Sequence, residues 1–118
     1  MDDPARYRAY LGCTVDVVID RPLGSTHPRH DFIYKTNYGY IEGTQAGDGE
    51  EIDVYVLGVF KPIENYRGLC VGVILRRDDD EHKLVAADHR MTASAIRQQT
   101  DFVERFYDIS IETWMADA

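Results

Sequence analysis

Asp48-Gly-Glu-Glu-Ile-Asp-Val-Tyr-Val-Leu57 joins an acidic turn to an apolar segment. Within it, Ile52, Val54 and Val56 recur at every second residue, so in an extended chain they share one face. The aspartate at position 53 then lies on the other face, together with Tyr55 and Leu57. The segment therefore predicts a β-strand with a carboxylate near its start.

A second apolar segment, residues 69–75, is followed by a second acidic run, Asp78-Asp-Asp-Glu81. Its nearly continuous apolar character predicts a strand buried on both faces, as in a barrel or sandwich. Residues 83–87 are again apolar after Lys83 and predict the return strand of a hairpin. Both acidic runs are thus expected at the ends of strands.

The flanking sequence adds further short elements. Residues 14–20 and 37–41 are typical of strands, and residues 21–30 contain two prolines and a glycine that predict a loop. Apolar spacing predicts an amphipathic helix over about 92–107, after which residues 109–111 alternate again. We expect a mainly β (α+β) fold, namely a small closed OB-like β-barrel with one C-terminal amphipathic helix packed on it.

The two acidic runs contain eight of the 21 Asp and Glu residues and account for the whole acidic excess over the 13 Lys and Arg residues. Crowded carboxylates repel one another and raise one another's pKa. Two solvated turns explain such runs most simply. If the fold brings the runs together, divalent cations must neutralise them, and oxygen ligands suit Mg2+ or Mn2+.

Composition limits the remaining classes of function. A chain of 118 residues can bury one core, so we expect residues 1–118 to form a single domain. The net charge of −8 argues against a nucleic-acid or membrane surface. The acidic start lacks the features of a signal peptide, and no segment is long and apolar enough to span a membrane, so we expect a cytoplasmic protein.

Three segments together resemble the family I soluble inorganic pyrophosphatases. They are Asn37-Tyr-Gly-Tyr-Ile41, the 48–54 acidic segment, and Val71-Gly-Val-Ile-Leu75 leading through the acidic turn to Lys83. The resemblance covers about residues 15–107. The family's Asp-x-Asp-x-x-Asp pattern is matched except that Glu50 replaces the middle aspartate. The resemblance implies a pyrophosphatase-like domain that hydrolyses pyrophosphate with Mg2+.

Residue roles follow from this resemblance. Asp48, Asp53, Asp78 and Glu81 are implied to be metal ligands, with Asp79 and Asp80 as alternatives in a turn two residues shorter than is usual in the family. Glu50 and Asp53 are implied to be catalytic, with Glu50 at the carboxylate that binds the attacking water. Metal ions lower the pKa of that water and neutralise charge on the leaving phosphate.

On the phosphate side, the resemblance implies that Arg21, Tyr38 and Lys83 bind the substrate. Each also has a simpler structural explanation, as a strand end for Arg21 and Lys83 or as a packed strand aromatic for Tyr38. The family has Tyr-Lys at its helix end, where this chain has Phe106-Tyr107. Phosphate contacts are then expected to be fewer, or to come from Arg29, Arg76 or Arg77.

Three functions remain open at this stage. The first is Mg2+-dependent pyrophosphate hydrolysis, the second is hydrolysis of another phosphoanhydride, and the third is a non-catalytic metal- or phosphate-binding module. A homo-oligomer is expected by analogy with the family. His27 and His30 lie in a proline-containing loop with no third ligand nearby in sequence, which favours a plain loop over a transition-metal site.

Overall fold

The computed structural model describes residues 3–46, 49–78 and 81–114. In chain order its elements are α1 (Pro4–Arg8), β1 (Thr14–Arg21), β2 (Asn37–Ile41), β3 (Ile52–Val56), β4 (Asn65–Arg76), β5 (Lys83–Ala87), α2 (Ala93–Glu104) and β6 (Ile109–Thr113). The expected strands are present. The short helix α1 was not predicted; Asp3 caps it, accepting a hydrogen bond from the Ala5 amide at 2.9 Å.

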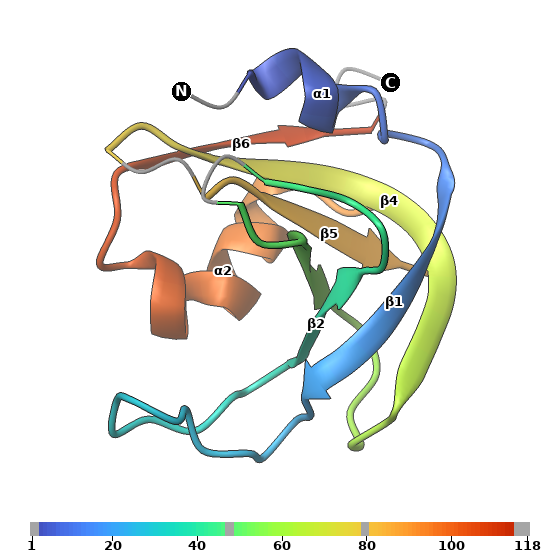
Figure 1. Ribbon diagram of the computed structural model, residues 1–118. Helices are drawn as coiled ribbons and strands as arrows, with labels where there is room; N and C mark the ends of the chain where they lie inside the picture. Colours follow the sequence, from blue (N-terminus) through green and yellow to red (C-terminus); the bar gives the residue numbers. More distant parts are fainter. Residues whose placement is uncertain (1–2, 47–48, 79–80, 115–118) are drawn as a thin grey trace.

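Five strands close into a barrel in the order β1-β2-β3-β5-β4, because β1 also pairs with β4. Figure 1 shows β4 as a long curved strand that spans the molecule. Its residues 65–69 pair with β1, and its residues 72–76 pair with β6. One strand therefore both closes the barrel and carries β6. The expected closed barrel is confirmed.

Apolar residues form two buried clusters that follow the alternation along β3. Ile52, Val54 and Val56 pack in one cluster with residues of β1, while Tyr55 and Leu57 pack in the other with α2. This division confirms the two faces expected from the sequence. Asp53 lies on the same face as Tyr55, and so on the side of the barrel that α2 covers.

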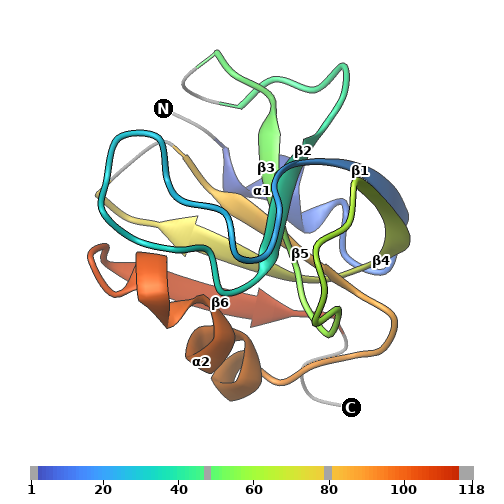
Figure 2. The ribbon, with the colours of Figure 1, turned by 90° about the horizontal axis from the view of Figure 1, so that it is seen from below.

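Helix α2 packs on that side of the barrel, as Figure 2 shows. The Thr92 hydroxyl caps it by accepting a hydrogen bond from the Ala95 amide at 3.1 Å. The helix ends at Glu104 and not at Tyr107 as expected, because residues 105–107 form a turn in which the Tyr107 amide bonds to the Glu104 carbonyl at 3.0 Å. In the part of the chain that the structure describes, no helix is long and apolar enough to cross a membrane.

Candidate active site

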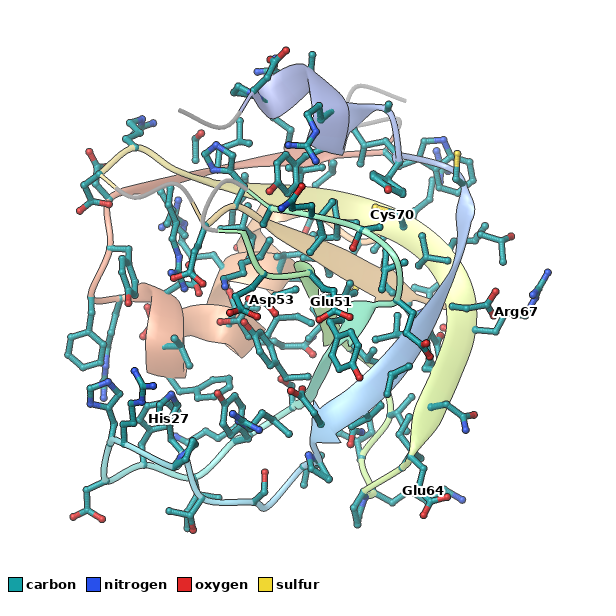
Figure 3. All side chains as sticks on the ribbon, viewed as in Figure 1. His27, Glu51, Asp53, Glu64, Arg67 and Cys70 are labelled. Atoms are coloured by element: carbon teal, nitrogen blue, oxygen red, sulfur yellow. The ribbon has the colours of Figure 1, made fainter. Side chains whose placement is uncertain are left out.

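A cavity of about 700 Å3 lies between the barrel and the end of α2. Its walls come from the end of β1, the loop after it, strands β2 to β5 and residues 102–107. Figure 3 shows Asp53 on the α2 side of the barrel, whereas Arg67 points outward on the opposite side. Arg21, Tyr38, Asp53, Glu81 and Lys83, all predicted site residues, line this cavity. The fold thus brings together residues that are up to about sixty positions apart in the sequence.

Asp53 and Lys83, both predicted site residues, form a largely buried ion pair at the cavity wall. The parallel pairing of β3 with β5 places them opposite each other. The Lys83 ammonium donates to the Asp53 carboxylate at 2.6 Å and lies 3.6 Å from a Glu81 carboxylate oxygen. The Lys83 side chain is 3% exposed and that of Asp53 27% exposed. Two carboxylates therefore already share one cation at the cavity wall.

Tyr38 stands beside this pair, opposite Arg21 in the β1–β2 pairing and opposite Tyr55 in the β2–β3 pairing. Its ring centroid lies 5.7 Å from the Lys83 ammonium. Burial, and next the charge of Asp53, raise the pKa of Tyr38 well above its ordinary value. Its hydroxyl therefore remains protonated at neutral pH and can donate a hydrogen bond.

The end of β1 contributes Arg21 together with Asp20, which the sequence analysis did not single out. The β1–β2 pairing shifts in register between Ile19 and Arg21, so the side chains do not alternate regularly there, and the consecutive residues Asp20 and Arg21 both line the cavity. The Arg21 guanidinium lies 3.6 Å from the Asp20 carboxylate. Partial burial raises the pKa of Asp20, and Arg21 partly opposes this effect. An acidic residue beside a predicted phosphate-binding arginine was the signal that could have revealed Asp20.

A second buried pair lies deeper, between Arg76 of β4 and Glu104 of α2. The guanidinium donates to both carboxylate oxygens, at 3.0 and 2.7 Å, and the Tyr55 hydroxyl donates to the same carboxylate at 2.6 Å. Burial alone would lower the pKa of Arg76, but hydrogen bonding and the charge of Glu104 raise it above its ordinary value. The Tyr107 ring covers the guanidinium at 3.7 Å. Arg76 is thus fixed in place at the cavity.

Other expected residues lie elsewhere. Glu50 and Asp78 are exposed and do not line the cavity, and Asp48, Asp79 and Asp80 lie outside the described residues. Of the three arginines considered for phosphate binding, Arg76 lines the cavity and Arg29 and Arg77 do not. Within residues 3–46, 49–78 and 81–114, no three Asp, Glu, His or Cys side chains are gathered closely enough to hold a metal ion by themselves. The helix end does face the cavity, since Phe106 and Tyr107 line it.

Comparisons with known proteins agree with this architecture. The fold is similar to that of the inorganic pyrophosphatase from Ehrlichia chaffeensis, with 19% identity, a TM-score of 0.68 and 88% of each chain covered. For the pyrophosphatase from Coxiella burnetii the values are 17%, 0.66 and 88% of each chain. The inorganic pyrophosphatase from Neisseria gonorrhoeae is 23% identical, with a TM-score of 0.57 and with 76% of this chain and 71% of the other chain covered. No curated protein sequence matches the chain.

The family model described as inorganic pyrophosphatase matches residues 16–117, which is most of the sequence. The match contains β1 from Asp16 onward, all later strands, helix α2 and all the charged residues of the cavity. Sequence and fold therefore lead to the same assignment: this chain belongs to the inorganic pyrophosphatase family, a family of enzymes that hydrolyse pyrophosphate.

Proposed function

We propose that this protein hydrolyses inorganic pyrophosphate to phosphate in a Mg2+-dependent reaction, with Mn2+ as an alternative cation. The observation that carries the proposal is the Asp53–Lys83 pair, whose ammonium also lies within 4 Å of Glu81 on the cavity wall. Carboxylates for a cation and an ammonium for a phosphate are thereby held at one place.

The donors fit a hard divalent cation. Asp53 and Glu81 offer carboxylate oxygens and share a positive charge, that of Lys83. Mg2+ usually keeps several waters and binds through one or two carboxylates together with substrate phosphates, so it does not require a preformed cage of protein ligands. Asp53 and Glu81 would hold the ion, with Asp48 and Asp78 as further ligands. Bound there, the ion would lower the pKa of a water molecule and neutralise phosphate charge.

The protein's own cations and hydroxyl would then bind the substrate. Lys83 and Arg21 offer charge-assisted hydrogen bonds to phosphate oxygens, and the arginine can do so in a bidentate way. The protonated Tyr38 hydroxyl adds a neutral donor. Asp53 would also position the attacking water, a role that it would share with Glu50. Because Glu50 lies outside the cavity lining, this role requires Glu50 to come closer to the substrate.

The direct test is phosphate release from pyrophosphate, with Mg2+ and with EDTA, by the parental protein and by Asp53→Asn. We expect Mg2+-dependent release by the parent and a loss of at least about 100-fold in the variant, because the substitution removes a charge and leaves the volume nearly unchanged. Asp16→Asn is the matched control. Asp16 is an exposed β1 carboxylate that pairs with Arg67 at 3.1 Å, away from the cavity.

The outcomes separate the alternative functions. If ATP or another small phosphoanhydride is hydrolysed and pyrophosphate is not, the family's substrate assignment fails for this chain. Binding of Mg2+ and phosphate without turnover of any phosphoanhydride would indicate a non-catalytic module. Near-parental activity of Asp53→Asn, with its circular dichroism unchanged, would show that the central acidic motif does not have the proposed role.

We further propose that the protein is a single-domain cytoplasmic homo-oligomer. The family match over residues 16–117 supports the single domain, and the family assignment supports the assembly. Sedimentation velocity across a range of protein concentrations tests the oligomeric state.

A further inference from the structure

The cavity has a charged wall and an aromatic entrance. We define the aromatic entrance as His30 and Phe32, from the loop after β1, together with Phe106 and Tyr107 at the end of α2. His30 is exposed, Phe32 and Tyr107 are half-buried, and Phe106 is 70% exposed. These rings therefore remain accessible at a cavity whose inner wall carries Asp53 and Lys83.

The loop side of the entrance is held together by ring contacts. His27 lies with its ring centroid 4.7 Å from that of His30 and 4.9 Å from that of Phe32. Its Nδ1 atom accepts hydrogen bonds from the Arg29 and His30 amides at 3.0 and 3.1 Å. Figure 3 shows His27 on this loop, on the same side of the barrel as Asp53. The aromatic faces are thus presented by an organised loop.

The entrance also connects to the charged wall through a short series of contacts. The Phe32 centroid lies 5.4 Å from that of Tyr34, which lies 5.5 Å from that of Tyr38. Tyr38 in turn lies 5.7 Å from the Lys83 ammonium. Three successive contacts thus connect Phe32 of the entrance with the proposed phosphate-binding cation.

Inorganic pyrophosphate does not account for these features. It is small, fully polar and has no surface that stacks on a ring, whereas the cavity of about 700 Å3 falls in the range of sites for whole organic ligands. A single exposed aromatic is ordinary, as Phe60 at 83% exposure shows. Phe106 differs because it faces a cavity shared with the three other rings of the aromatic entrance and with charged groups.

From this arrangement we infer that the site accepts, besides inorganic pyrophosphate, a phosphoanhydride that carries a planar aromatic base, that is, a nucleoside diphosphate or a close analogue. The inference rests on the proposed function, because it places the anhydride at Asp53 and Lys83. The base would stack on the rings of the aromatic entrance, because every base offers a π-face to an aromatic side chain. Hydrolysis would add one water, break the bridging P–O bond and release a nucleoside monophosphate and phosphate.

Isothermal titration calorimetry of the whole protein with Mg2+ provides the test, with ADP and methyl diphosphate as ligands. Both carry the same diphosphate ester, and only ADP carries a base. We expect ADP to bind at least about tenfold more tightly, and Phe106→Ala and Phe32→Ala each to remove most of that ratio while leaving methyl diphosphate affinity unchanged. Phe60→Ala is the matched control and should change neither affinity.

Equal affinities for ADP and methyl diphosphate would overturn the inference, as would a preference for ADP that survives both cavity substitutions. Pyrophosphate hydrolysis is measured separately. Turnover of pyrophosphate together with equal affinities would leave the proposed function intact and reject only the aromatic ligand. Tight, Phe106-dependent ADP binding without any turnover would support the ligand class and reject the catalytic proposal.

Discussion

Glu104 is the residue on which the junction between α2 and the barrel depends. Its side chain is 1% exposed, and it accepts hydrogen bonds from Arg76 and from the Tyr55 hydroxyl. A charge removed from water in this way is tolerated only because its partner and further hydrogen bonds compensate it. The carboxylate thus fixes the helix end that forms one wall of the cavity.

Replacing Glu104 by glutamine should destabilise the protein by about 3 kcal/mol, because Arg76 would remain buried without a compensating charge. Urea unfolding measures the change in the free energy of unfolding. Glu112→Gln is the control, since Glu112 pairs with Arg8 at 2.7 Å on the surface, where such a pair contributes at most about 1 kcal/mol. Equal losses in the two variants would contradict a special role for the buried pair.

The alternation of side chains along a strand predicts one part of the site. Asp53 was placed opposite the Ile52 face because side chains alternate along a strand, and the cavity does contain it. The alternation of side chains along a strand did not predict the pairing of Arg76 with Glu104. Their pairing joins β4 to α2 across 28 positions, and neither residue's local pattern shows which long-range partner compensates its burial.

At the scale of the element, β2 depends on a glycine. A Cβ atom built on Gly39 would lie 1.8 Å from the Val18 carbonyl oxygen in β1. That neighbour is backbone and cannot move aside without disturbing the β1–β2 pairing. Gly39 also separates Tyr38 from Tyr40, so the same close approach sets the position of the Tyr38 side chain at the cavity.

Gly39→Ala should therefore cost more than about 3 kcal/mol of unfolding free energy, above the usual range for overpacking. Gly72→Ala provides the comparison. A Cβ atom at position 72 would lie 2.7 Å from the end of the Ile96 side chain. Because that side chain can rotate away, we expect Gly72→Ala to lower the free energy of unfolding by only about 1 kcal/mol. Urea midpoints of the two variants give the ranking, and a Gly39 variant as stable as the Gly72 variant would refute it.

Most strands were predictable because they are short and bounded by turn residues, whereas the boundaries of two elements were not predictable. The helix was expected to reach Tyr107, but it ends at Glu104, where a turn brings Phe106 and Tyr107 to the cavity. The beginning of β4 was missed because the apolar segment that predicted the strand covers only residues 69–75, whereas β4 begins at Asn65. Its pairing with β1 is a long-range effect that the local apolar pattern does not show.

For the whole molecule, the formal charge of −8 and the carboxylates at the cavity predict a response to divalent cations. A cation that binds only the folded state stabilises it by RT ln(1+[L]/Kd), or about 2.7 kcal/mol at 100 times Kd. Millimolar Mg2+ should then raise the melting temperature by about 10 °C in calorimetry. NaCl at matched ionic strength controls for screening, and Asp53→Asn should reduce the shift. A melting temperature that responds to Mg2+ no more than to NaCl would count against the metal site.

Strand β4 also determines when the fold can first close. The first residues of β1 pair with residues 65–69, about fifty positions later in the chain. Closure of the barrel therefore depends on contacts between distant parts of the sequence. The pairings that close it are complete once β5 has been added, at Ala87. The cavity needs more, because Phe102, Phe106 and Tyr107 come after that point. During synthesis, a nascent chain can thus possess its barrel before it possesses a binding site.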